Sequence, residues 1–137
     1  MLLNLKTGRV EGYDEGQDPL IYLVSSAQAV EATGIKFVYS DGHGLAMFTQ
    51  WFDDLVHIDE VDWTVVNQRY WTDTIDDMDR QRKKQAEFLV HECCPWDLIQ
   101  EIVVIDASTK QRVETIQAAF PVTQRRVVRV DRSWYYW

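Results

Sequence analysis

The sequence predicts a mixed α+β fold, and three observations lead to this class. Short runs rich in strand-forming residues recur along the 137-residue chain. Segments with helical spacing and capping residues lie between these runs. Hydrophobic residues make up 46% of the chain, and this length can bury one core but not two independent ones. We therefore expect a single domain over residues 1–137.

The first third of the chain predicts a strand, a helix and a second strand. Residues 20–24 form a short apolar run of strand formers. Either of two serines, Ser25 or Ser26, can then cap a helix over residues 27–32. Residues 36–39 predict the second strand, and the connection is too short to indicate a parallel crossover reliably.

The middle of the chain predicts two helices followed by a loop. Apolar residues recur at helical spacing over residues 45–55, which indicates a buried helix. A second helical stretch covers residues 62–71. Residues 72–79 are polar, acidic and without periodicity, so we expect an exposed loop there.

Residues 85–91 alternate in the manner of a half-buried strand. One face is apolar and should pack against the core, whereas the other face is mostly polar. The expected inner residues are Ala86, Phe88 and Val90, and the expected outer residues are Gln85, Glu87, Leu89 and His91.

The last third predicts two strands around a helix. Residues 102–105 are the most strand-like run in the chain. A helix capped by Ser108 or Thr109 should follow and end at Phe120, and residues 125–131 predict the second strand. The residues expected on the buried face of the helix are Val113, Ile116 and Phe120.

Charge and cysteine usage exclude several classes of protein. The net charge of -8 argues against diffuse, charge-driven binding of nucleic acid. Any such contact would have to use the basic stretches at residues 80–84 and 125–132. Cys93 and Cys94 are neighbours, so we expect reduced thiols and no metal site. No membrane-spanning or signal segment is visible, and we expect a cytoplasmic protein.

Two positions could carry chemistry. Glu87 lies on the polar strand face beside a basic run, where a carboxylate could orient a ribose hydroxyl or stabilise an oxocarbenium-like centre. The alternative is a surface glutamate paired with Arg82 or Lys84. His43 lies in the turn Ser40-Asp-Gly-His-Gly44, whose glycines allow a tight bend at a strand end. A purely structural turn is the alternative there.

Other residues could bind a nucleic acid. The run Arg80, Arg82, Lys83 and Lys84 could contact phosphates, although such a run is more often a solvated face. Exposed rings among Trp63, Tyr70 and Trp71 could stack on unpaired bases, whereas buried ones would belong to the core.

These residues occur in ordered segments that resemble the DarT family of DNA ADP-ribosyltransferase toxins. The resemblance covers nearly the whole chain, and the order of the segments is its specific feature. They comprise residues 2–10, 21–26, 37–43, 51–55, 58–63, 70–71, 80–90, 95–96 and 134–136, among them Phe37-Val-Tyr-Ser-Asp-Gly-His43 and Arg80-Gln-Arg-Lys-Lys-Gln-Ala-Glu-Phe-Leu-Val90.

The resemblance implies an ADP-ribosyltransferase fold with mainly antiparallel sheets. It implies transfer of ADP-ribose from NAD, as substrate, to thymine bases of single-stranded DNA in a toxin–antitoxin system. Glu87 falls on the catalytic glutamate. The region from about residue 43 to residue 87 would shape target recognition, which places several predicted site residues near DNA. They are His43, Tyr70, Trp71, Arg80, Arg82, Lys83 and Lys84.

The resemblance further implies that the chain corresponds to the carboxyl-terminal part of the family. The family's amino-terminal segment, with a histidine that holds NAD and a catalytic arginine, has no counterpart in the sequence. Two alternatives therefore stay open: an incomplete fragment or noncatalytic module that binds single-stranded nucleic acid, and a small regulatory domain. A macrodomain antitoxin and a homo-oligomer are the further partners to consider.

Overall fold

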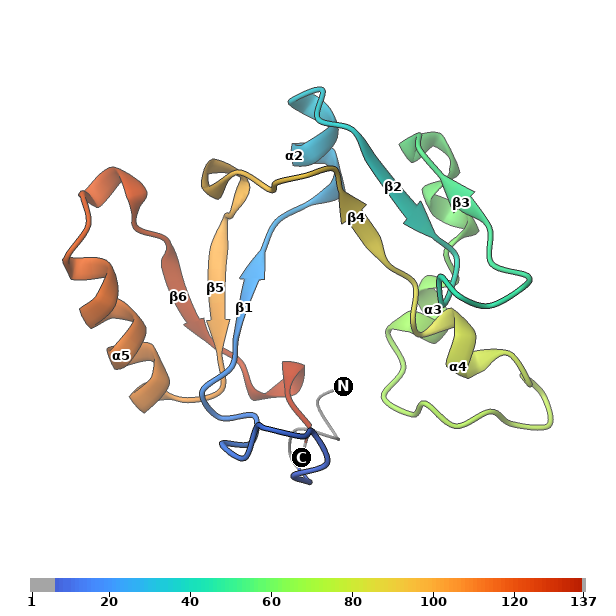
Figure 1. The fold of residues 1–137 in the computed structure, drawn as a ribbon, viewed down its shortest axis with the longest axis horizontal. Helices are drawn as coiled ribbons and strands as arrows, with labels where there is room; N and C mark the ends of the chain where they lie inside the picture. The colour runs from blue at the N-terminus through green and yellow to red at the C-terminus, as the bar shows by residue number, and fades with distance from the viewer. Residues whose placement is uncertain (1–6, 137) are drawn as a thin grey trace. The chain divides into compact units, whose positions relative to one another are not determined.

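The computed structural model describes residues 7–136, which form two compact units (Figure 1). The first unit contains residues up to 25 together with residues 95 onward, and the second contains residues 26–94. Helices and mainly antiparallel strands build both units, so the predicted α+β class is confirmed. That the two units make a single domain stays a prediction.

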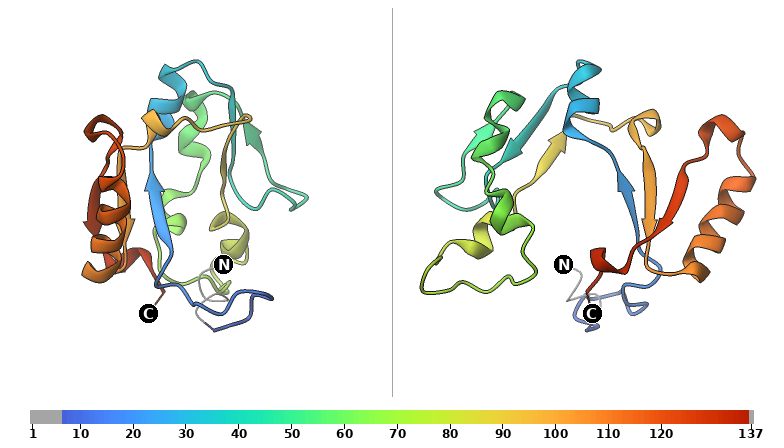
Figure 2. Two further views of the ribbon diagram at one scale, coloured as in Figure 1. Left: turned by 60° about the vertical axis from the view of Figure 1, so that its left-hand side comes forward. Right: turned by 180° about the vertical axis from the view of Figure 1, so that it is seen from behind.

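The first unit is a three-stranded sheet covered by one helix. Strands β1 (Ile21–Val24), β5 (Glu101–Val104) and β6 (Val127–Val130) lie in the order β1-β5-β6. β1 pairs antiparallel with β5, and β5 pairs parallel with β6. A parallel pair needs a crossover, which helix α5 (Ala107–Ala118) supplies alongside β5 and β6 (Figure 2).

The core of this unit lies between the sheet and α5. Ile102, Val104 and Val128 are nearly fully buried, and Val113 of α5 packs against them. These residues come from the runs that predicted β5 and β6. Three successive residues of β5 are buried, and a strand buried on both faces reads as continuous apolar sequence. The strand predictions for this unit are confirmed.

Two details of α5 differ from the prediction. Asp106 caps the helix, since its carboxylate accepts a hydrogen bond from the N–H of Thr109 at 2.8 Å. This bond lowers the pKa of the Asp106 carboxyl. Ile116 and Phe120 are exposed, because α5 turns Val113 and Gln117 toward the sheet instead.

The carboxyl-terminal segment forms hydrogen bonds with the loop before β1. The buried Tyr135 lies directly after the short helix η4 (Arg132–Trp134), and its hydroxyl is 2.8 Å from the carbonyl oxygen of Leu20. Gln17 is also buried and pairs through its side chain with the backbone of Tyr136. Two further short helices lie in this unit, η2 (Trp96–Leu98) and η3 (Val122–Gln124).

The second unit begins with helix α2 (Ala27–Ala32), which Ser26 caps as predicted. An antiparallel sheet follows, in the order β3-β2-β4. Its strands are β2 (Phe37–Ser40), β3 (Trp51–Phe52) and β4 (Phe88–Val90). The strand predicted over residues 36–39 is confirmed one residue further along the chain, and the strand predicted over residues 85–91 is confirmed in shorter form.

Aromatic rings form the inner face of this sheet. Tyr39 is almost fully buried, and its ring stacks on those of Phe52 and Phe88. Phe37 stacks on Phe88 with ring centroids 5.0 Å apart. Leu89, on the opposite face of β4, is 46% exposed, as the alternation predicted.

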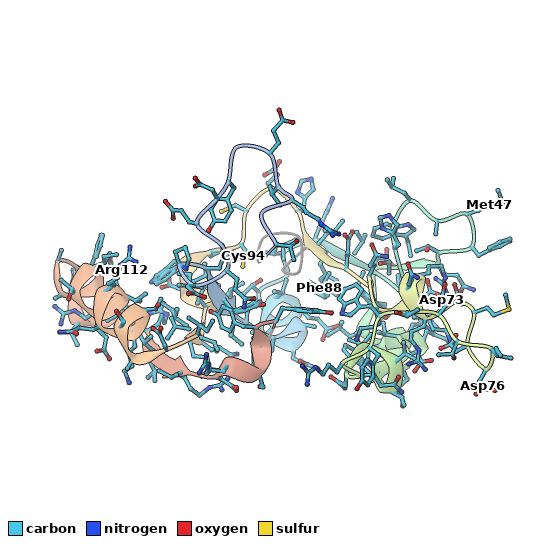
Figure 3. The ribbon with its side chains drawn as sticks, turned by 90° about the horizontal axis from the view of Figure 1, so that it is seen from below. Met47, Asp73, Asp76, Phe88, Cys94 and Arg112 are labelled. Atoms are coloured by element: carbon cyan, nitrogen blue, oxygen red, sulfur yellow. The ribbon has the colours of Figure 1, made fainter. Side chains whose placement is uncertain are left out.

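The predicted buried helix over residues 45–55 is wrong. Residues 41–50 form a loop in which Leu45, Met47 and Phe48 are at least 80% exposed. Figure 3 shows Met47 at the outer edge of this loop. The helical spacing does not reflect burial, because no element within residues 7–136 covers these apolar side chains. The chain continues into β3 and then into the short helix η1 (Leu55–Glu60).

The segment before β4 is only partly helical. Helix α3 (Trp63–Val66), capped by Asp62, is much shorter than the predicted stretch over residues 62–71. The predicted loop over residues 72–79 is confirmed, and helix α4 (Arg80–Lys83) follows it. In the part of the chain that the structure describes, no helix has the length and apolarity needed to cross a bilayer.

Candidate functional site

Glu87 lies immediately before β4, where the buried Ser40 fixes its backbone. The N–H of Ser40 donates to the carbonyl oxygen of Glu87 at 2.9 Å, and the N–H of Glu87 donates to the Ser40 hydroxyl at 3.1 Å. The hydroxyl in turn donates to the carbonyl oxygen of Gly42 at 2.6 Å. One side chain therefore joins the base of Glu87 to the turn that carries His43.

The Glu87 carboxylate lies beside Gly44 and the ring of Trp51. A Cβ atom added to Gly44 would be 3.5 Å from Oε2 of Glu87 and 2.8 Å from Cζ2 of Trp51. Glu87 is exposed and Trp51 is 44% exposed. A carboxylate and an aromatic ring thus lie against the partly exposed backbone of Gly44.

This group has the parts that glycosidic chemistry needs. An accessible carboxylate can hold a ribose hydroxyl or stabilise positive charge that develops at a sugar carbon. An exposed ring offers a flat surface on which a base can stack. The sequence pattern missed Trp51, because it was assigned to a buried helix, and it missed the support that Ser40 gives to Glu87.

The structure brings His43 next to the basic run. The N–H of His43 donates to the carbonyl oxygen of Arg82 at 2.8 Å. Its own carbonyl oxygen accepts from the hydroxyl of Thr49 at 2.6 Å and from the N–H of Ala46 at 2.9 Å. The ring nitrogen Nδ1 is buried and has no hydrogen-bond partner among residues 7–136. The backbone of the turn is thus held by three hydrogen bonds, whereas one imidazole nitrogen has no partner within the described residues.

The side chain of Arg82 is held by three residues of the same unit. Its Nη1 is 2.9 Å from Oδ1 of Asp41 and 3.3 Å from the hydroxyl of Thr49, and its Nε and Nη2 lie within 2.9 Å of the Asp79 carboxylate. The hydrogen bond to Asp79 and the charge of Asp41 raise the pKa of the guanidinium. Arg82 thus joins the loop 41–50 to the end of the acidic loop 72–79.

Lys83, the next residue, is also held by two carboxylates of the same unit. Lys83 lies 3.3 Å from carboxylate oxygens of both Asp62 and Asp77. Burial acts to lower the pKa of Lys83, but its hydrogen bonds to these carboxylates outweigh that effect and raise it. Two negative charges of the chain therefore lie beside the positive charge of Lys83.

Lys84 caps the end of α3 and contacts a predicted stacking residue. Its Nζ donates to the carbonyl oxygens of Val66, at 2.9 Å, and Gln68. The same atom lies 5.2 Å from the centroid of the Trp71 ring, a cation–π distance. Burial and the charge of Arg80 lower the pKa of Lys84.

The remaining predicted DNA contacts differ in their accessibility. Tyr70 is 74% exposed and Trp71 is 43% exposed, so both rings can be reached from solvent. Arg80 is partly buried, and its Nε has no hydrogen-bond partner within the described residues. Asp73 and Asp76, labelled in Figure 3, belong to the neighbouring acidic loop. The roles of all these residues, and of Glu87, stay predictions.

A surface depression in this unit contains none of the predicted site residues. It is wide and open, and residues of α2, β2 and β4 and of their connections line it. They include Lys36, Val38, Asp53, Leu89 and His91. The predicted site around Glu87 therefore lies outside this depression.

Comparison with known proteins identifies relatives of the whole chain. The chain is 40% identical over 136 residues to a DNA ADP-ribosyl transferase of Thermus aquaticus, which covers 99% of this chain and 58% of that protein. It is 38% identical to Thermus sp. 2.9 DarT, solved in complex with NAD+ and in complex with ADP-ribosylated ssDNA. Both structures give a TM-score of 0.90 over 98% of this chain, and the match covers 66% and 63% of those chains.

These matches confirm the ADP-ribosyltransferase-like α+β fold. The chain spans about three fifths of the length of the curated relatives it matches, 58% and 63% for the two from Thermus. A family model described as "DarT: ssDNA thymidine ADP-ribosyltransferase, DarT" matches residues 1–136. Since that match covers almost every residue, the chain belongs to the DarT family.

Proposed function

We propose that the chain transfers ADP-ribose from NAD to thymine bases of single-stranded DNA, with Glu87 as the catalytic carboxylate. The observation that carries the proposal is the accessible Glu87 carboxylate beside Gly44, on a backbone that Ser40 fixes. The relatives support it, since one is named a DNA ADP-ribosyl transferase and Thermus sp. 2.9 DarT was solved with NAD+ and with modified ssDNA.

The reaction exchanges one bond for another at the nicotinamide ribose. The glycosidic bond breaks, nicotinamide leaves with the bonding electrons, and a nitrogen of thymine forms the new bond and loses its proton. Positive charge develops at the sugar carbon before the new bond forms. Glu87 orients the ribose through a hydroxyl group and stabilises that charge.

Target DNA would lie over the loops that precede Glu87. Tyr70 and Trp71 are exposed and suited to stacking on bases. His43 Nδ1 and Arg80 Nε have no partner in the described residues, but both atoms are buried, so DNA would reach them only after the covering side chains move. The basic residues Arg82, Lys83 and Lys84 were predicted to contact phosphates, but each would first have to leave partners within the chain.

Other parts of the proposal concern the whole protein. We propose that residues 1–137 supply the Glu87 side of the cleft, and that the histidine and arginine implied by the resemblance belong to family sequence outside this match. A macrodomain antitoxin that reverses the mark, a cytoplasmic location and self-association complete the proposal.

Intact-mass analysis of a thymine-containing single-stranded oligonucleotide, incubated with NAD and the chain, tests this function. We expect a mass gain of one ADP-ribose with the parent chain and none with Glu87→Gln, which keeps the size of the side chain. Lys110→Ala is a surface control in the other unit, where Lys110 pairs with Glu114.

Two results would count against the proposal. Equal gains from the parent and from Glu87→Gln would remove Glu87 from catalysis. No gain from the chain, while an active full-length relative modifies the same oligonucleotide, would favour the noncatalytic module. Salt-sensitive binding of single strands would then separate that module from a regulatory domain.

A further inference from the structure

We infer that Arg82 is a positioning residue that holds the loop 41–50 against Glu87, and that it does not bind a DNA phosphate. The inference rests on the proposed function, because it assigns a role within the same site. The sequence predicted that Arg82 contacts a phosphate, whereas in the structure its side chain binds Asp41, Thr49 and Asp79 of the same unit.

The donors of the Arg82 guanidinium are used within the chain. Nε and Nη2 bind the carboxylate of Asp79, and Nη1 binds Asp41 and the hydroxyl of Thr49. Only 16% of the side chain is exposed. Two carboxylates surround one guanidinium, so this position presents no excess positive charge to a phosphate.

The backbone of Arg82 contacts the same loop. Its carbonyl oxygen accepts from the N–H of His43, and Gly42 lies directly against it. A Cβ atom added to Gly42 would be 2.9 Å from both the carbonyl oxygen and Cγ of Arg82. Backbone and side chain of one residue therefore fix the position of residues 41–43.

These contacts extend to the atoms around Glu87. Asp41, which binds Arg82, also accepts a hydrogen bond from the N–H of Gln50 at 2.9 Å and so closes the loop. Trp51 follows Gln50 directly, and its ring lies on Gly44 beside the Glu87 carboxylate. Loss of the Arg82 contacts should therefore release Gly44 and Trp51 while leaving the Ser40 support of Glu87 in place.

A phosphate contact and a positioning role predict different results for Arg82→Lys. Lysine keeps the charge and would largely preserve a phosphate contact, but it cannot bind Asp41, Thr49 and Asp79 together. For a positioning role, Arg82→Lys should behave like Arg82→Ala. In transfer assays, both should lower kcat and leave KM for the oligonucleotide within about twofold.

Amide hydrogen exchange followed by mass spectrometry is the first test, because it needs no turnover. We expect both variants to raise exchange over residues 41–50 by about tenfold or more, on the scale of one or two lost hydrogen bonds. Exchange over β2 and β4 should stay as in the parent. Parental exchange over residues 41–50 in Arg82→Ala would overturn the inference, and so would an increase spread evenly over residues 26–94.

The salt dependence of binding to a thymine-containing single strand is the second test. A positioning residue leaves the slope of log affinity against log salt unchanged, whereas loss of one phosphate contact reduces it by about 0.7. A reduced slope for Arg82→Ala together with a parental slope for Arg82→Lys would overturn the inference. Were the proposed function itself wrong, the exchange test would still decide the role of Arg82.

Asp41→Asn is the second variant, for the case that Arg82→Ala does not fold. It weakens the contacts to Arg82 and Gln50 while retaining the guanidinium. We expect faster exchange over residues 41–50 and slower transfer. Tighter DNA binding with parental exchange would instead mean that the released guanidinium binds phosphate, which would overturn the inference. Lys110→Ala should match the parent in every assay.

Discussion

The backbone N–H of Glu87, the residue just before β4, donates a hydrogen bond at 3.1 Å to the hydroxyl oxygen of Ser40, the last residue of β2. Ser40 is 1% exposed, and the same hydroxyl donates to the carbonyl oxygen of Gly42. The proposed catalytic carboxylate thus depends on a buried side chain that makes no contact with solvent. The backbone position of Glu87 therefore follows from the packing of β2.

Replacing Ser40 with alanine should destabilise the second unit. The N–H of Glu87 and the carbonyl oxygen of Gly42 would both lose a buried partner, which costs roughly 1–3 kcal/mol. Urea unfolding should show this loss, whereas Ser108→Ala at an exposed position should stay within about 0.5 kcal/mol of the parent. Parental stability of Ser40→Ala would contradict the role we give to this hydroxyl.

Alanine should be tolerated less well at Gly42 than at Gly44. At Gly42 the new methyl group would meet the backbone oxygen of Arg82 at 2.9 Å, which cannot move without shifting α4. At Gly44 it would meet the Trp51 ring, a partly exposed side chain that can rotate away. We expect a lower urea midpoint for Gly42→Ala than for Gly44→Ala, and the reverse order would refute this argument.

Tyr70→Ala should weaken binding of single-stranded DNA without affecting folding. The ring is 74% exposed, and loss of one base stack costs roughly 1–3 kcal/mol, or about 5- to 150-fold in affinity. Fluorescence anisotropy with a labelled thymine-rich oligonucleotide measures this change. Phe120→Ala removes another exposed ring, in the first unit, and should bind like the parent. Equal affinities for all three chains would exclude a stacking role for Tyr70.

Tyr135 should make the first unit sensitive to alkaline pH. Burial raises its pKa to about 12, whereas an unfolded tyrosine titrates near 10. The folded state therefore holds this proton more tightly, and the resulting stability is complete below about pH 10. It is lost as the pH rises toward about 12.

Urea unfolding at several pH values measures this effect. The parent should lose stability between about pH 10 and pH 12, and Tyr135→Phe should lose less over the same interval. The variant should also be less stable than the parent at pH 7, because the carbonyl oxygen of Leu20 loses its donor. Identical pH profiles for the two chains would contradict the assignment.

Local sequence predicted the elements whose pattern reflects burial. The apolar run that became β5 is buried on both faces, and the serine at position 26 caps α2 through its own neighbouring backbone. Such features depend on residues that are neighbours in the sequence. The strand that follows Glu87 belongs to this group, because its alternation survives in the exposed Leu89 and the stacked Phe88.

Sequence patterns gave wrong predictions where contacts beyond the nearest neighbours in the chain determine the structure. The spacing of apolar residues around Met47 is helical, but the hydrogen bonds of Asp41 to Gln50 make the segment a loop. Likewise, the run around Arg82 has the composition of a phosphate-binding surface, yet its carboxylate partners lie far along the chain or in the acidic loop. Composition describes charge but does not show which acceptors are nearby.

The order of the two units along the chain has a consequence for folding kinetics. β1 precedes the whole second unit and its partner β5 follows it, so the first sheet forms only when distant parts of the chain meet. Closing a long flexible loop carries an entropic cost that grows with its length. If residues 26–94 collapse first, the effective loop becomes much shorter. We therefore expect the rate at which β1 and β5 pair to depend on how early residues 26–94 become ordered.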